Sequence, residues 1–295
     1  MLRPHPASPL EYWFFKVNHP PVALLVDWIC RRRAGVGVVR ISVHSPAGRE
    51  VLHLPHPAVL RHGAAELAMT ETAWRRGPVR WHLRLRASSD RVRPRVLLAE
   101  ILRLLDLSLE SAPRVTFDGW IEHRGERFPI DDARGMVSHY WGRALPPEWW
   151  WMSANCFDAP DVVIESAWLR SRLWGTSAAL PLGYFYLQRG SQSVFRISPP
   201  RRLSVAGSPE AFDVVVGGGW RLPSITLRAR GREYASLGDG IVNTLTGDLE
   251  VWEDDRLVAR ATGTAALERR QPADSAAMTD AFASRHPDVL QRPRA

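Results

Sequence analysis

Alternation between hydrophobic and polar positions dominates this chain and predicts β-strands. The clearest case is the segment 79–87, in which apolar residues alternate with arginines and one histidine. Successive side chains of a strand point to opposite faces of its sheet. This segment is therefore predicted to bury one face and to expose the arginines on the other.

Comparable segments follow one another along most of the chain, with glycine or proline between most of them. Strands are predicted at 11–18, 23–31, 37–44, 49–54, 64–74, 79–87, 114–123, 126–130, 149–157, 161–170, 182–189, 193–197, 212–216, 223–230, 233–236, 241–252 and 256–267. Helix propensity competes in 64–74, and the leucine-rich spacing of 96–105 favours a helix. Many short strands separated by turns are typical of a sandwich or a barrel.

Two aromatic-rich stretches divide the chain. Each half of the chain begins with one of these stretches, EYWFF at 11–15 and EWWWM at 148–152, which suggests two related β-modules. We place these modules at 1–134 and 135–270. The strand pattern is lost over 271–295, which is expected to be a polar, mobile tail.

Three consecutive tryptophans, Trp149 to Trp151, must point to both faces of the strand predicted at 149–157. One face is wholly apolar and is interpreted as core, with Trp150, Met152, Ala154 and Cys156. The other mixes rings with polar groups, through Trp149, Trp151, Ser153, Asn155 and Phe157. This second face suits the wall of a pocket for a large hydrophobic ligand. A second packed core, with Asn155 bonded to backbone, would give the same pattern.

Composition narrows the function classes. The hydrophobic content of 45% and the charged content of 24% are ordinary for a soluble globular protein. The net charge is +8, but arginines occur throughout and accompany 31 acidic residues, so nucleic-acid binding is not expected. A transient contact with an anionic membrane surface stays open, as does the oligomeric state. The two cysteines, Cys30 and Cys156, imply no disulfide framework.

Several sequence motifs are missing. The N-terminus lacks a secretory signal pattern, and no apolar run reaches the roughly 18 residues of a membrane span, so a cytoplasmic protein is expected. The chain contains no GxGxxG, P-loop, GxSxG or HExxH. His53 and His56 form only a weak pair, so no metal site is expected.

Other motifs resemble the tocopherol cyclase and carotenoid 1,2-hydratase superfamily, which also includes AttH-like proteins and some lipocalin-like pericyclases. Residues 11–17, EYWFFKV, are similar to the family's opening E-x-W-[YF]-F-K-V, and GPVRW follows at 77–81. The likeness is strongest over 119–157, which holds HYWG at 139–142 and NCF at 155–157. These motifs are moderately specific for the superfamily, but they do not distinguish among its activities.

The resemblance implies an all-β fold of two lipocalin-like β-barrel or sandwich modules in tandem, with an apolar cavity. It also implies a hydrophobic small-molecule substrate, an isoprenoid or a polyene, that is cyclised or hydrated by alkene protonation without a metal or redox cofactor. Cycloaddition of a polyene by a pericyclase is a second enzymatic alternative. A non-catalytic carrier of a hydrophobic metabolite is a third, because a fold does not dictate a function.

Alkene protonation requires a strong acid, which a buried carboxyl group can supply because desolvation raises its pKa. The catalytic candidates are His139, Glu165 and Tyr140. His139, which with Trp141 matches the His-x-Trp of carotenoid hydratases, could be a general acid or could bond within a turn. Glu165 stands in an apolar strand and could face solvent or be a buried acid. Tyr140 stands where tocopherol cyclases often have asparagine.

Aromatic faces stabilise cations, so the substrate-binding candidates are mostly rings. They are Trp13, Phe15, Trp141, Trp149, Trp151, Asn155, Phe157 and Asp27. Ordinary core packing is an equal alternative for Trp13 and Phe15, and the solvent face is the alternative for Asp27. Glu11 and Lys16, at either end of the first aromatic strand, are expected to form an ion pair at the barrel rim.

Overall fold

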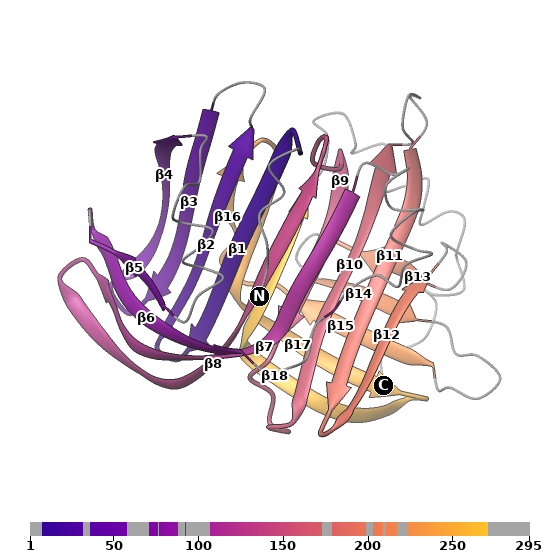
Figure 1. Ribbon diagram of the computed structural model, residues 1–295. Coiled ribbons are helices and arrows are strands. Elements are labelled where there is room, and N and C mark those ends of the chain that lie inside the picture. The colour runs from indigo at the N-terminus through magenta and orange to yellow at the C-terminus, as the bar shows by residue number, and fades with distance from the viewer. Residues whose placement is uncertain are drawn as a thin grey trace.

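The structure, a computed structural model, describes residues 8–31, 36–57, 71–75, 77–87, 92, 107–172, 179–198, 203–208, 211–216 and 224–270. Every regular element in these ranges is a β-strand, and the strands form two antiparallel, curled sheets (Figure 1). The all-β prediction is confirmed. The helix predicted at 96–105, the first part of the segment 64–74 and the tail at 271–295 lie outside the described residues.

The first sheet contains eight strands. These are β1 (Leu10–His19), β2 (Val22–Arg31), β3 (Val36–Ser45), β4 (Gly48–Pro57), β5 (Glu71–Trp74), β6 (Val79–Ala87), β7 (Leu107–His123) and β8 (Glu126–Gly142). Their order is β4-β3-β2-β1-β8-β7-β6-β5, so the first and last strands along the chain are neighbours in its middle. A side chain at Gly135 would collide with the backbone oxygen of Lys16, which explains why glycine stands where β8 passes β1.

The second sheet contains ten strands. These are β9 (Glu148–Ala154), β10 (Val162–Arg172), β11 (Ala179–Arg189), β12 (Gln192–Ser198), β13 (Leu203–Gly207), β14 (Ala211–Val216), β15 (Ile225–Arg230), β16 (Ala235–Gly238), β17 (Ile241–Glu253) and β18 (Arg256–Arg270). Their order is β12-β11-β10-β9-β18-β17-β15-β14-β13, with β16 paired to β17. Here too the first strand, β9, pairs with the last, β18.

Several details differ from the sequence-based expectation, among them the start of β7 at Leu107 where position 114 was predicted. β8 runs past the boundary placed at 134 and ends at Gly142, so the chain changes sheet only between 143 and 147. The end of β8 pairs with β1, which keeps it in the first sheet. β9 ends at Ala154, earlier than the predicted 157, and β13 was not predicted. The turn at Arg124-Gly125 is confirmed, since both residues have the positive φ of a tight hairpin.

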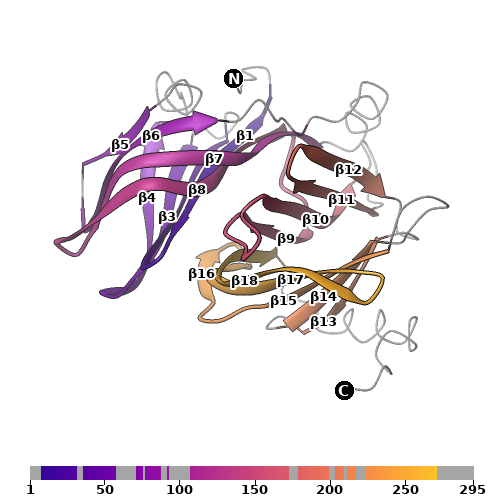
Figure 2. The same cartoon turned by 90° about the horizontal axis from the view of Figure 1, so that it is seen from below.

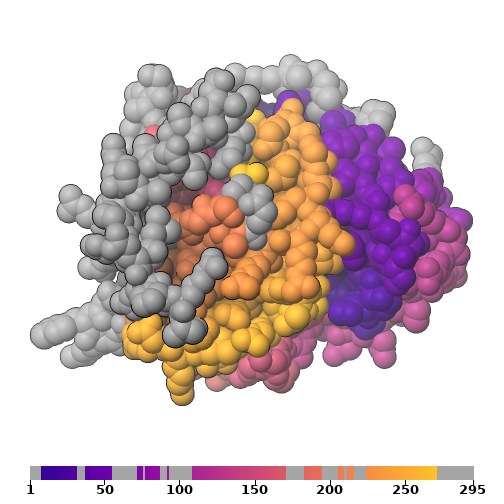
Figure 3. All heavy atoms as spheres, turned by 180° about the vertical axis from the view of Figure 1, so that it is seen from behind, coloured from indigo at the N-terminus to yellow at the C-terminus, as the bar shows by residue number. Residues whose placement is uncertain are grey.

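Each sheet packs a hydrophobic core of its own on one face. Trp13, Phe15 and Trp81 belong to the core of the first sheet, and Trp150 and Phe185 to the core of the second. The opposite faces of β1 and β9 meet where the two sheets pack together. Figure 2 shows the two sheets from below, and in Figure 3 the orange and yellow atoms of the second sheet adjoin the indigo and purple atoms of the first. We call this contact region the junction.

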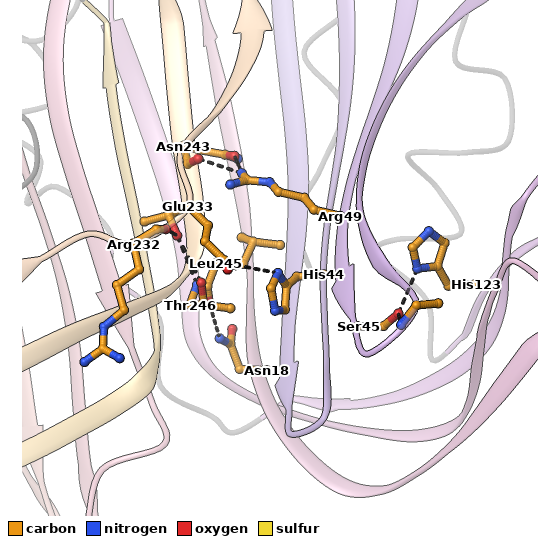
Figure 4. Close-up of polar contacts among 12 residues, drawn as sticks. Asn18, His44, Ser45, Arg49, His123, Arg232, Glu233, Asn243, Leu245 and Thr246 are labelled. Atoms are coloured by element: carbon orange, nitrogen blue, oxygen red, sulfur yellow. Dashed lines mark hydrogen bonds and ion pairs between the residues drawn. The ribbon is translucent and has the colours of Figure 1, made fainter.

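Polar contacts at the edge of the junction fix the two sheets relative to each other (Figure 4). Asn18 of β1 donates from Nδ2 to the carbonyl oxygens of Leu245, at 3.2 Å, and Thr264, at 2.6 Å. Arg49 of β4 donates to the backbone oxygen of Asn243 in β17 at 2.7 Å. Each of these contacts joins the first sheet to the second, so the contacts fix the relative position of the two sheets on either side of the junction.

Candidate functional site

The junction receives the even-numbered side chains of β1. Tyr12, Phe14 and Lys16 point toward the second sheet, because Trp13 and Phe15 already occupy the core of the first. β9 contributes Trp149 and Trp151 from the opposite side. Phe14 and Trp151 meet edge to face, with ring centroids 5.4 Å apart. The junction is therefore packed with aromatic side chains from both sheets.

Glu165 of β10 lies in the junction with its side chain fully buried. Ser111 of β7 donates from Oγ to Oε2 of Glu165 at 2.6 Å, and the hydroxyl of Tyr184 in β11 donates to Oε1 at 2.9 Å. Burial raises the pKa of Glu165, whereas the hydrogen bonds from Ser111 and Tyr184, together with Trp151 and the charge of Lys16, act in the opposite direction. The solvent-facing alternative for Glu165 is therefore wrong.

Lys16 lies close to Glu165. Its Nζ donates to the backbone oxygen of Ser153 at 3.0 Å and to Oγ of the same residue at 3.2 Å. Ser153 in β9 is the direct register partner of Glu165 in β10. Burial lowers the pKa of Lys16 to about 8, although Cys156 and Glu165 favour its charged form.

A second polar cluster in the junction joins β1, β2 and β3. Arg40 binds Oδ2 of Asp27 through Nε at 3.0 Å and Nη2 at 2.8 Å. The hydroxyl of Tyr12 donates to Oδ1 of Asp27 at 3.0 Å. Burial raises the pKa of Asp27, and Arg40 and Tyr12 oppose that change. Asp27 is buried, so its solvent-facing alternative is wrong.

Glu268 of β18 reaches the same cluster from the second sheet. The indole Nε1 of Trp149 donates to its Oε1 at 3.0 Å. Burial, and next the negative charge of Asp27, raise the pKa of Glu268 to about 7, although Arg40 opposes this. Near neutral pH this carboxyl group therefore holds its proton for a large part of the time. The junction thus contains three buried carboxyl groups with raised pKa, those of Asp27, Glu165 and Glu268, and each is bonded to an aromatic side chain. In the described part of the chain, only Asp27 of these three is held by an arginine.

The structure assembles only some of the residues predicted for the site. Glu165, Asp27, Trp149 and Trp151 all face the junction. Tyr140 pairs in register with Tyr12, and the two rings contact each other edge to face with centroids 6.3 Å apart. The prediction that Trp149 and Trp151 share a face distinct from that of Trp150 is confirmed.

His139 lies on the other face of β8, in the interior of the first sheet. Its ring stacks on Trp13 with centroids 3.5 Å apart, and Nε2 lies 3.3 Å from Oε1 of Glu11. Trp141 contacts the same ring at 4.8 Å between centroids. Consecutive residues of a strand point in opposite directions, so His139 and Tyr140 cannot act on one ligand in one site. Trp13, Phe15, His139 and Trp141 are separated from the junction.

Phe157 and Asn155 follow the end of β9 and do not continue its alternation. Phe157 packs in the core of the second sheet, so its placement on the Trp151 face is wrong. Asn155 is buried at the seam between the sheets, where Arg134 donates to its backbone oxygen at 3.5 Å. Among the described residues its Nδ2 meets no hydrogen-bond acceptor.

The ion pair expected between Glu11 and Lys16 is also wrong. An odd and an even position of β1 lie on opposite faces, and both side chains are fully buried rather than at a rim. Glu11 faces His139, and Lys16 faces Ser153. The strict alternation of β1 was a sufficient signal against the pair.

Sequence reasoning missed several residues of the junction. These are Tyr12, Lys16, Arg40, Ser111, Tyr184 and Glu268. Arg40 carried a usable signal, because it is a charge within the apolar segment VVRISV, just as Asp27 and Glu165 are charges within apolar strands. Ser111 and Tyr184 carried no such signal, since a hydroxyl in a strand is common on any face.

In the ranges that the structure describes, no group of three or more His, Cys, Asp and Glu side chains could hold a metal ion. The same ranges contain no helix with the length and apolar character needed to cross a membrane.

Comparison with known proteins gives matches in sequence and in structure. Residues 114–268, more than half of the 295-residue chain, match the family described as tocopherol cyclase-like. A curated relative, "Probable tocopherol cyclase, chloroplastic" of Oryza sativa subsp. japonica, is 28% identical over 149 residues. That alignment covers 46% of this chain and 32% of the rice protein, so the chain spans about a third of that relative's length.

Solved structures with the same fold cover nearly the whole chain. An AttH-type protein of Nitrosomonas europaea superposes with a TM-score of 0.63 at 14% identity, covering 90% of this chain and 93% of its own. Kievitone hydratase of Nectria haematococca gives 0.56 at 11% identity, covering 91% and 90%. CghA, solved with Sch210972, gives 0.62 at 12% identity, covering 90% and 88%. The expected lipocalin-like fold is confirmed.

Proposed function

Because the chain belongs to the tocopherol cyclase-like family, we propose that it is an enzyme that protonates a double bond of an isoprenoid or polyene substrate in the junction. Capture of the resulting cation by a group of the substrate would close a ring, and capture by water would give a hydrated product. The observation that carries the proposal is the pair of buried carboxyl groups, Glu165 and Glu268, set among aromatic rings that line both sides of the junction.

Glu165 is the proposed acid. A carboxylic acid can protonate an alkene only if it is protonated in the resting enzyme, and burial favours that form. When the proton leaves, the carboxylate already accepts hydrogen bonds from Ser111 and Tyr184. These donors stabilise the anion without any rearrangement, so the charge that forms in the transition state meets prepared partners.

Glu268 is the second proton source. Its raised pKa of about 7 keeps a proton available near neutrality, and Trp149 holds its position. Asp27, bound to Arg40, is its anionic neighbour from the first sheet. Glu268 therefore owes part of its raised pKa to a residue of the first sheet.

The aromatic side chains have the complementary role. Phe14, Trp151 and Tyr12 present faces and edges to the junction. An aromatic face stabilises a nearby cation by roughly 0.5–2 kcal/mol, and a dry site delays its capture by bulk water. His139 has no part in this scheme, since it lies in the core of the first sheet.

The proposal is tested by incubating the purified protein with a lipid extract of its source cells and identifying bound or altered species by mass spectrometry. A product isomeric with its precursor indicates cyclisation, and a product heavier by one water indicates hydration. The double variant Glu165→Gln, Glu268→Gln serves as the control and should yield neither. Recovery of an unchanged lipid at one per protein would overturn the enzymatic proposal in favour of a carrier.

The double variant also separates protonation from a templated cycloaddition. A pericyclase needs only a shaped cavity that holds a reactive conformer. An isomeric product that forms equally well with both carboxyl groups removed would therefore contradict protonation by Glu165 or Glu268.

A further inference from the structure

Lys16 is the only lysine of the chain, and its whole side chain is buried in the junction. An ammonium group carries three hydrogens. Two of the directions around Nζ are taken by the backbone oxygen and the Oγ of Ser153, and both acceptors are uncharged. Within the described ranges no carboxylate forms an ion pair with this amine. A buried amine with so few partners gains little from keeping its charge.

The ionisation of Lys16 reflects this setting. Burial lowers its pKa to about 8, from an ordinary value of 10.5, so part of the population is the neutral amine near neutral pH. A neutral amine is a nucleophile, and lysines that react with carbonyl groups are activated by desolvation of this kind.

An acid stands beside the amine. Ser153, which holds Nζ, is the register partner of Glu165, and directly opposite residues of an antiparallel pair have Cβ atoms about 4.5–5.5 Å apart. Glu165 is the proposed proton donor of the site. The apolar side chains of Phe14, Met136 and Trp151 pack in the same junction. An amine, an acid and an apolar surface are the components that imine formation needs.

We propose that Lys16 forms a reversible imine with an apolar aldehyde or ketone bound in the junction. This inference rests on the proposed function for the location of the ligand. The nitrogen lone pair attacks the carbonyl carbon, and one amine proton passes to the carbonyl oxygen to give a carbinolamine. Glu165 then protonates the hydroxyl group, which leaves as water while the carbon–nitrogen double bond forms. The products are a protonated imine, the Glu165 carboxylate and one water.

The charges of that product suit the site. The protonated imine is a cation on Lys16, and the carboxylate of Glu165, held by Ser111 and Tyr184, is its counter-ion. A cationic imine withdraws electrons from a conjugated chain attached to it. The junction could therefore activate an unsaturated carbonyl compound as well as hold it.

Reductive trapping tests the inference. The intact protein is incubated with decanal and sodium cyanoborohydride, digested, and analysed by peptide mass spectrometry. We expect one decyl group on Lys16, formed about tenfold faster than on the N-terminal amine, given the local concentration of ligand bound beside Lys16. The N-terminal amine is an internal standard, and the same reaction in urea shows that the Lys16 peptide is detectable.

Two variants serve as controls. Lys16→Arg keeps a cation and donors for Ser153 but cannot form a stable imine, so its only adduct should be at the N-terminus. Glu165→Gln removes the acid and should slow labelling of Lys16 by about tenfold or more. A folded wild-type protein labelled at the N-terminus and not at Lys16 would overturn the inference, and Lys16 would be only a tie between β1 and β9.

Decan-1-ol distinguishes this outcome from a failure of the proposed ligand site. It has the same chain and no carbonyl group, so it should bind in the junction and compete with decanal. Binding of decan-1-ol that depends on Trp151, together with an unlabelled Lys16, would reject the imine and leave the ligand site intact. If decan-1-ol blocks the labelling of Lys16, the result supports both the imine and the ligand site in the junction. If Lys16 is labelled equally well in the presence of decan-1-ol, the aldehyde and the alcohol do not bind in the same site, which would contradict the inference.

Discussion

Ser111 of the first sheet donates a hydrogen bond of 2.6 Å to Glu165 of the second. The acid and one of its two hydrogen-bond donors thus come from different modules, and the family match over 114–268 includes only the acid. Lys16 and Asp27, also from the first sheet, complete the polar surroundings of the two buried carboxyl groups. The chemistry of the junction therefore depends on how the two sheets pack.

Replacing either member of that pair should change activity in a different way. Glu165→Gln removes the proton and should lower turnover by about 10²-fold or more. Ser111→Ala removes a bond that lowers the pKa of Glu165, so the pKa should rise further and activity should persist to higher pH, with a loss of about tenfold. Rate–pH profiles with the substrate identified from the lipid extract give both results.

Ser166→Ala is a matched control for this pair. Ser166 neighbours Glu165 in β10, is equally buried, and bonds to the backbone of Tyr184 from the opposite face of the strand. Its replacement should leave the pH profile in place. Unchanged turnover in Glu165→Gln would exclude Glu165 as the acid.

Glu268 should make the stability of the protein depend on pH. Its pKa is about 7 when folded and near 4.5 when unfolded, so below pH 4.5 both states are protonated. As the pH rises from 4.5 to 7 the unfolded state loses its proton first, and folding is progressively disfavoured, by on the order of 3 kcal/mol in full.

The variant Glu268→Gln cannot ionise and should not show this loss. Urea unfolding at pH 4.5 and pH 8 measures the free energy of unfolding of both proteins. Between pH 4.5 and pH 8 the free energy of unfolding of the variant should rise relative to that of the wild type, and most of this rise should appear by pH 7. A difference that is the same at both pH values would show that the pKa of Glu268 is not raised by folding.

His139 should behave as a structural residue. Its ring is stacked on Trp13 and faces Glu11 in the core of the first sheet, so His139→Ala should destabilise the fold by about 2–4 kcal/mol. Ligand affinity in the junction should change by less than about twofold in the folded variant, because the site lies across the sheet. Chemical unfolding and ligand titration measure the two effects. A collapse of turnover with unchanged stability would restore the acid role of His139.

The positions of the strands and the alternation of their faces were predictable from the sequence. For the strands at the centre of the first sheet, however, the sequence does not show which face packs into the core and which faces the junction. The alternation at 79–87 has one wet face, and β6 forms there as predicted. β1 is buried on both faces, so a difference in polarity between its two faces cannot show which one belongs to the core and which to the junction. For this reason the sequence favours Trp13 over Tyr12 as a site residue, whereas the interpretation of His139 rests on its resemblance to the His-x-Trp of carotenoid hydratases.

The second half of the site depends on contacts between residues distant in sequence. Glu268 reaches the junction because β18 pairs with β9, which lies more than a hundred residues earlier in the chain. Its partner Asp27 belongs to the other sheet. Local pattern cannot predict such pairings, although it did identify Asp27, Glu165 and the Trp149–Trp151 face as unusual.

Trp151 offers the most direct test of whether the junction binds ligand. Its ring meets Phe14 of the first sheet edge to face, and its register partner in the second sheet is Ala167. Trp151→Ala removes a large apolar surface and should weaken ligand binding by about 10–100-fold. Trp151→Phe keeps an aromatic face and should retain most of the affinity.

Trp150→Phe, which alters the core of the second sheet on the other side of β9, should lower stability and leave affinity nearly unchanged. Isothermal titration with the lipid recovered from the protein compares all three, and equal affinities in wild type and Trp151→Ala would remove β9 from the ligand site.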